Sequence, residues 1–172
     1  MIEIRKEQPA DYPAIYHVNQ SAFGRNAEAR LVNSLRKNNN VFIPDLSLVA
    51  VDGENVVGHI LFTKIKIDDG GVEHDSLSLA PMAVLPVYQK QGIGTRLIKK
   101  GLSEAKNLGY HSVVVLGHEG YYPKHGFDKA SNYNINAPFE VPEAAFMCIA
   151  LIEDGLKGIN GTVRYPKEFD AV

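Results

Sequence analysis

One stretch of about forty residues, from 76 to 116, restricts the fold of this chain more than any other. Ser76 to Val84 is typical of a strand, and Ser112 to Leu116 is nearly all apolar, as expected of a strand buried on both faces. Between them, Gly92 to Leu108 carries one apolar stripe at helical spacing. A strand, a helix and a buried strand in this order form a βαβ unit, so we predict that the two strands are parallel neighbours.

The residues before this unit predict an antiparallel hairpin preceded by helices. Apolar runs at Leu46–Val51 and Val56–Ile67 flank a turn at residues 52–55, and 68–71 forms a second turn. Further elements are expected as a strand at 2–5, a helix through 14–23, a helix starting near Asn26, and strands at 145–152 and 161–165. We therefore predict one mixed α/β domain over 1–172, with a core at about 1–152 and a C-terminal extension at 153–172.

Composition excludes several classes of protein. The formal net charge of the 172 residues is −2 and no basic run stands out, which argues against a nucleic-acid or membrane-surface binder. Cys148 is the only cysteine, so neither an intrachain disulfide nor a thiol-rich metal site can form, and we expect no metal. No segment approaches the roughly 18 apolar residues of a membrane span, and no signal peptide is visible. We expect a cytoplasmic protein.

The segment Met82–Arg96 carries the chemistry. Gly92 and Gly94 let the backbone pass close to a ligand, and the first helical turn that follows leaves unpaired N–H groups at the positive end of the dipole. Such an end binds phosphate readily. Donors and positive charge nearby come from Gln89, Lys90, Thr95 and Arg96. The residues alone leave two interpretations open: a phosphate site, or glycines that only allow tight helix–strand packing.

Two nucleotide-binding motifs do not fit this segment. A P-loop needs Lys followed by Ser or Thr after its second glycine, whereas Gly94 is followed by Thr95 and Arg96. A dinucleotide fingerprint needs a third small residue where Leu97 stands.

A different family matches at two places in register. Gln89-x-x-Gly92-x-Gly94, preceded by Ala83-Val84-x-Pro86, resembles the acetyl-CoA signature of the GCN5-related N-acetyltransferase (GNAT) superfamily. Tyr121-Tyr122-Pro-Lys-His-Gly126-Phe127 resembles that family's segment after its fifth strand. The resemblance covers roughly residues 1–150. The tail Gly161-Thr-Val-Arg-Tyr-Pro-x-x-Phe169 is also similar to an uncharacterised bacterial branch of the family.

The resemblance implies a fold and a cofactor site. The fold is a mixed, mostly antiparallel sheet with a central parallel βαβ unit, splayed fourth and fifth strands, and helices on both faces. The co-substrate is acetyl-CoA, with no metal. Its pyrophosphate is held by backbone N–H groups of Gln91 to Thr95, and its pantetheine pairs with the main chain of Met82 and Val84. The implied cofactor-binding residues are Met82, Ala83, Val84, Gln89, Lys90, Gln91, Gly92, Ile93, Gly94, Thr95, Tyr121 and Tyr122.

The presence of Pro81 supports the implied separation of the two strands independently of the resemblance. Proline cannot donate to a strand ladder, so a central strand avoids it unless a bulge or break is present. We predict a bulge near Ala80 to Met82, the alternative being that Pro81 simply ends a short strand.

The implied reaction is N-acetylation, in which a primary amine attacks the thioester of acetyl-CoA directly within a ternary complex. The family places an N–H donor for the carbonyl oxygen at Met82. Tyr122 matches the family's general acid. A phenol suits that role because it stays protonated at neutral pH. The alternative is that Tyr122 is a packed aromatic residue that anchors the cofactor. Glu28 is the first candidate for the general base, and His118 is the second. The alternative for Glu28 is an ordinary residue in the first turn of a helix. The other histidines show no ligand-like spacing.

The acceptor is a small-molecule amine or a protein amine, and variable loops at 20–30, 68–75 and 130–145 are expected to select it. Two alternatives to this function remain: a non-catalytic acyl-CoA-binding or sensing domain, and a transferase that uses another acyl-CoA. The C-terminal strands are a candidate edge for a homodimer, and the sequence does not choose between monomer and dimer.

Overall fold

In the computed structural model, which describes residues 1–172, nine strands form one sheet. The order across it is β1-β2-β3-β4-β5-β8-β6, with β9 beside β3 and β7 beside β9. The strands are β1 (Ile2–Lys6), β2 (Phe42–Asp52), β3 (Asn55–Asp69), β4 (Val72–Val84), β5 (Ser112–Leu116), β6 (Asp128–Lys129), β7 (Ile135–Asn136), β8 (Phe146–Ala150) and β9 (Gly161–Arg164).

Most neighbouring strands in this sheet run antiparallel. The central exception is the predicted β4–β5 pair, which is parallel, with Leu77 opposite Val113 and Ser78 opposite Val114. The short β7 is also parallel to β9. The prediction of a mixed, mostly antiparallel sheet with a central βαβ unit is confirmed.

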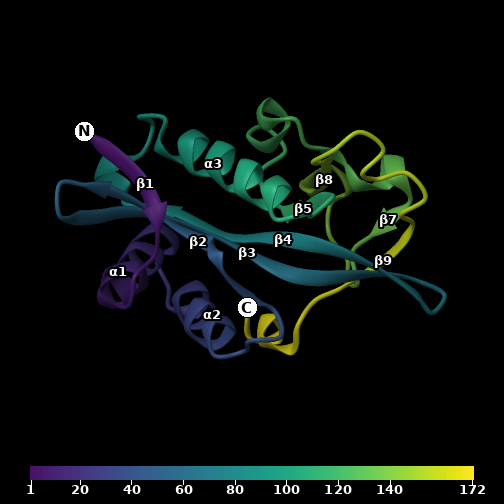
Figure 1. The fold of residues 1–172 in the computed structure, drawn as a ribbon, viewed down its shortest axis with the longest axis horizontal. Helices are drawn as coiled ribbons and strands as arrows, with labels where there is room; N and C mark the ends of the chain where they lie inside the picture. Colours follow the sequence, from purple (N-terminus) through teal and green to yellow (C-terminus); the bar gives the residue numbers. More distant parts are fainter.

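Helices cover both faces of the sheet (Figure 1). The first two, α1 (Tyr12–Phe23) and α2 (Ala27–Arg36), lie on one face, and α3 (Ile93–Asn107) lies on the other. Each buries a stripe of apolar side chains, because that is how an amphipathic helix removes its apolar face from water. Asn26 stands at the start of α2 as expected, but its side chain accepts a hydrogen bond from Gln20 (2.7 Å) instead of capping the helix.

The core beside α3 is tightly packed because the helix lies very close to β3. Leu97 and Ile98 are fully buried against the strands. A β-carbon on Gly101 would lie 2.2 Å from the ring of Phe62, so this glycine is what allows α3 to approach the sheet.

The C-terminal residues are part of the same sheet and do not form a detached tail. β9 pairs with β3, with Val163 opposite Ile67. Gly161 has φ of 129°, and a β-carbon there would lie 2.2 Å from the Asp68 carbonyl oxygen, so only glycine allows the two strands this approach. The chain then returns to the α1–α2 face and ends beside α2 in a short turn, η6 (Lys167–Ala171) (Figure 1). No helix of the chain has the length and apolar character to cross a bilayer.

Candidate active site

The two central strands separate at the point where the cofactor was expected. β4 pairs with β5 only at Leu77 and Ser78, then continues to Val84 with no strand on that side. Leu79 lies opposite Phe62 and Met82 opposite Ile60, so Ala80 and Pro81 together span a single position of β3. This is the bulge expected from Pro81, because its nitrogen has no hydrogen to donate to the ladder.

Beyond the bulge, the main chain of β4 presents hydrogen-bonding groups away from β3. The Leu85 amide donates to the Val57 carbonyl (2.9 Å), so Leu85 directs its N–H toward β3. In an antiparallel pair, every second residue directs its main-chain groups toward the partner strand and the residues between direct theirs away from it. Met82 and Val84 therefore direct their N–H and C=O groups to the side from which β5 has departed. Gln89 lies on that side, since its side-chain amide donates to the Val84 carbonyl (3.0 Å).

The entrance to α3 presents a row of free backbone amides. Lys90 and Gly92 both have left-handed backbone conformations, with φ of 64° and 81°. The first helical bond runs from the Arg96 amide to the Gly92 carbonyl (3.1 Å), and no side chain caps the helix. The amides from Gln91 to Thr95 have no backbone or side-chain acceptor. Alternating left-handed residues and a helix N-terminus both concentrate N–H donors, which makes this segment suited to an anion.

Two adjacent tyrosines connect this segment to the chain after β5. The hydroxyl of Tyr121 lies 2.6 Å from where a β-carbon on Gly94 would stand, and its pKa is raised by burial, an effect that a hydrogen bond with Thr95 partly offsets. Tyr122, at the start of η3 (Tyr122–His125), has only 9% of its surface exposed, and its ring occupies the space that a side chain on Gly117 would take. Burial raises the pKa of Tyr122 well above that of a free phenol, so this group keeps its proton at all physiological pH values.

A cavity of about 600 Å³ brings together predicted residues from four separate segments. Glu28 enters it from α2, Met82 from β4, His118 from the loop after β5, and Tyr121 and Tyr122 from the next turn. The remaining lining is mostly apolar: Phe23, Arg25, Leu31, Ser78, Leu79, Ala80, Pro81, Leu116, Gly117, Phe139, Tyr165, Phe169 and Val172. The residues from Gln89 to Thr95 do not line this cavity, which places the phosphate-type site beside it.

Glu28 is buried in the cavity wall but is not free. Arg25 donates to both of its carboxylate oxygens, from Nε at 2.9 Å and from Nη2 at a very short separation. The side chain of Arg25 is 60% exposed, so the pair extends from the wall to solvent. Each oxygen keeps a second lone pair, but the charge of the carboxylate is already balanced by Arg25.

The C-terminal segment supplies cavity residues that sequence reasoning missed. Tyr165 stacks on Phe139, with ring centroids 6.0 Å apart, and Phe169 packs against Tyr165 at 5.0 Å. Burial raises the pKa of Tyr165 to about 12, and a hydrogen bond with Ser78 offsets part of that rise. Loops 20–30 and 130–145 contribute to the cavity as expected, whereas 68–75 does not, because it forms the far turn of the β3–β4 hairpin (Figure 1).

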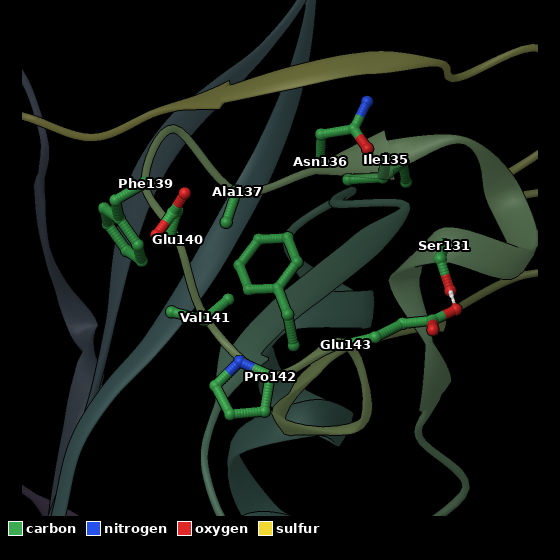
Figure 2. Close-up of a pocket in the computed structure, with 10 residues that line it drawn as sticks. Ser131, Ile135, Asn136, Ala137, Phe139, Glu140, Val141, Pro142 and Glu143 are labelled. Atoms are coloured by element: carbon green, nitrogen blue, oxygen red, sulfur yellow. Dashed lines mark hydrogen bonds between the residues drawn. The ribbon is translucent and has the colours of Figure 1, made fainter.

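A second hollow has a volume of about 630 Å³, and Figure 2 shows its lining. Phe139 belongs to the lining of both, and at the other end of the hollow Ser131 donates to Glu143 (2.6 Å). None of the predicted site residues lies in it. It is an open surface between a loop and β8, and it presents no set of convergent catalytic groups.

The remaining histidines do not form a site. His59 is fully buried between Ser47 (3.0 Å) and Asn19 (3.3 Å), and burial lowers its pKa to about 3, so it is a neutral packing residue. No group of three or more His, Cys, Asp or Glu side chains lies close enough together to hold a metal ion.

Comparison with known proteins gives matches over the whole chain. The model of the acetyltransferase (GNAT) family matches residues 5–127. The uncharacterized N-acetyltransferase YhbS of Escherichia coli K12 is 34% identical over 168 residues, which cover 97% of this chain and 98% of that protein. The uncharacterized N-acetyltransferase YjhQ of the same organism is 41% identical over 143 residues, which cover 81% of this chain and 77% of that protein.

Two solved structures share the architecture. The crystal structure of Escherichia coli YhbS in complex with CoA has a TM-score of 0.91 at 32% identity and covers 98% of this chain and 92% of that one. The structure of a GNAT family acetyltransferase from Brucella melitensis, in complex with acetyl-CoA, has a TM-score of 0.80 at 33% identity and covers 99% of both.

Proposed function

The chain belongs to the acetyltransferase (GNAT) family and is therefore an acyltransferase, and from this premise we propose that it moves an acetyl group from acetyl-CoA to a primary amine by direct attack in a ternary complex. The family resemblance of the two motifs is confirmed by these matches. The observation that carries the finer proposal is the single cavity in which Met82, His118 and Tyr122 meet beside the free amides of α3.

The residues present fit acetyl-CoA, which supplies an activated acetyl thioester. The free amides from Gln91 to Thr95 suit its pyrophosphate. The main chain of Met82 and the N–H of Val84 point away from β3 and suit the amide-bearing pantetheine arm, whereas the Val84 carbonyl already accepts from Gln89. The CoA and acetyl-CoA bound by the two structural relatives support this assignment. Tyr121, which spans from the second motif to the first turn of α3, would border the arm.

Met82 and Tyr122 are proposed to stabilise the two atoms that gain negative charge during transfer, the thioester carbonyl oxygen and the departing sulfur. The N–H of Met82 is directed toward the cleft between the separated strands, where it can donate to the thioester carbonyl oxygen as negative charge develops there. Tyr122 holds its phenolic proton firmly in the cavity wall and can give it to the departing sulfur.

The attacking nitrogen must lose a proton, and we assign its acceptance to His118. Its imidazole lines the cavity, is exposed to water and has no ion-pair partner. Glu28 lies in the same cavity, but both of its oxygens are engaged by Arg25. In this proposal Glu28 holds Arg25 at the mouth of the cavity, and His118 takes the proton directly or through one water.

Calorimetric titration with acetyl-CoA, followed by a thiol-release assay with amines, tests the function. We expect the wild-type protein to bind and Gly94→Asp to lose binding, because the new carboxylate meets both Tyr121 and the pyrophosphate position. Gly70→Asp is the matched control: it lies in a distant turn, a β-carbon there meets nothing within 4 Å, and Asp tolerates its φ of 58° better than most residues.

Four outcomes are distinct. Binding with amine-dependent thiol release supports the transferase. Binding without release for any amine favours a non-catalytic acyl-CoA-binding domain, and release only with a longer acyl-CoA favours the other transferase. Absence of binding by a folded wild-type protein would overturn the proposal.

A further inference from the structure

We propose that the acceptor is a primary monoamine carried on an apolar, preferably aromatic, carbon skeleton. The inference rests on the proposed function and specifies the substrate class of the same cavity. It follows from which rings line the cavity and from how its charges are already paired.

Aromatic rings from three distant segments converge on the cavity. Phe23 ends α1 and is 41% exposed, and Phe139, in the loop before β8, is 49% exposed. Tyr165 and Phe169 come from the C-terminal segment, and the stack of Phe139, Tyr165 and Phe169 forms a continuous wall. Large apolar rings left partly exposed inside a cavity indicate a ligand that covers them, because such surface is otherwise costly to leave in water.

The charged groups in the lining are already balanced against one another. Arg25 and Glu28 form a closed pair, and His118 is the one other ionisable side chain besides the tyrosines. No side-chain carboxylate of the lining remains free for a second ammonium of a polyamine or an aminoglycoside. No unpaired cation remains to hold the carboxylate of an amino acid. Burying either extra charge without a partner is strongly unfavourable.

One ammonium, by contrast, suits this lining. The amine arrives protonated, and the rings of Phe139, Tyr165 and Phe169 can cover its carbon skeleton. The ammonium passes one proton to His118, and the neutral nitrogen then bonds to the acetyl carbon as the carbon–sulfur bond breaks. Tyr122 protonates the sulfur, and the tyrosinate that remains takes the second proton from the nitrogen, directly or through one water. The products are the amide, the CoA thiol and one proton on His118, so atoms and charge balance with acetyl-CoA and the amine alone.

Matched pairs of amines test the inference by steady-state thiol release at saturating acetyl-CoA. Hexylamine and hexamethylenediamine differ in one terminal ammonium, and phenethylamine and phenylalanine differ in one carboxylate. We expect kcat/KM to favour hexylamine and phenethylamine over their charged counterparts by about tenfold or more. Preference for the diamine or for the amino acid would overturn the proposal.

Phe139→Ala provides an independent readout, since Phe139 is half-exposed and its loss should not unfold the protein. We expect KM for phenethylamine to rise about tenfold while the Kd of acetyl-CoA stays unchanged. Val72→Ala, an exposed apolar truncation at the far hairpin turn, should leave both values unchanged. An unaltered KM in Phe139→Ala would contradict the aromatic wall.

The same measurements separate this inference from the proposed function. If acetyl-CoA does not bind, the function itself fails. If acetyl-CoA binds and charged amines or proteins are acetylated while apolar monoamines are not, only the acceptor class is wrong.

Discussion

The phenolic oxygen of Tyr121 lies 2.6 Å from the position that a β-carbon on Gly94 would occupy. Gly94 belongs to the glycine segment at the entrance to α3, and Tyr121 to the second motif after β5. Glycine at 94 therefore has a second role besides leaving room for a ligand, which is to let Tyr121 rest on the first helical turn. The two motifs are parts of one packed site.

Gly94→Ala should weaken acetyl-CoA binding through this contact. The added methyl group displaces either the rigid tyrosine ring or the helix entrance, so we expect the Kd by calorimetry to rise about tenfold. The double variant with Tyr121→Phe removes the obstructing oxygen and should recover most of the loss. A double-mutant cycle measures this coupling, and strictly additive effects would show that the contact does not matter.

Tyr122→Phe should lower kcat by about a hundredfold and leave the Kd of acetyl-CoA unchanged. The variant removes only a hydroxyl and keeps the ring that packs on Tyr121 and Phe127. Thiol-release kinetics measure kcat, and circular dichroism checks the fold. An unchanged kcat would make Tyr122 a packed aromatic, the alternative role considered for it.

His118→Ala should lower kcat by at least about tenfold, with partial rescue by added imidazole, because a soluble base can enter the open cavity.

Glu28→Gln should chiefly raise the KM of the amine, because it releases Arg25 at the cavity mouth. If Glu28→Gln lowers kcat and imidazole fails to rescue His118→Ala, Glu28 is the base instead.

Burial of His59 should make the protein less stable as the pH falls below neutrality. The unfolded chain binds a proton on this side chain near its ordinary pKa of 6.5, whereas the folded protein binds it only near pH 3. Unfolding therefore takes up a proton between these values, and the free energy of unfolding falls by about 1.4 kcal/mol per pH unit as the pH is lowered.

Urea denaturation across the upper half of that window measures the slope before most carboxylates titrate. His59→Gln keeps a polar side chain opposite Ser47 and should show a shallower slope, although it is less stable overall. Equal slopes in the two proteins would contradict the assignment to His59.

Removal of residues 165–172 should open the acceptor side of the cavity while sparing the cofactor side. Tyr165 and Phe169 would be lost, but the free amides at α3 and the main chain of Met82 would not change. We expect the KM for phenethylamine to rise with little change in the Kd of acetyl-CoA. A melting curve checks the fold, since η6 packs beside α2.

Much of the architecture was predictable because its signals are local. The apolar stripe of α3, the nearly all-apolar β5 and the turns at 52–55 and 68–71 each depend on residues close together in the chain. The helix predicted at 92–108 is observed as Ile93–Asn107. Pro81 predicted the bulge for the same reason, because its missing N–H acts at its own position. The two motifs predicted the proposed cofactor side and Tyr122 without any tertiary information.

The acceptor side was decided only by tertiary structure. Nothing local marks Tyr165 and Phe169 as cavity residues; they reach it because β9 pairs with β3 and the chain then returns beside α2. Likewise, Glu28 is an ordinary first-turn residue in the sequence, and its closed pair with Arg25 depends on the chain between α1 and α2. Periodicity and turn chemistry act over a few residues, whereas a cavity is made by side chains that meet across the fold, and that meeting is set by the packing of the whole sheet.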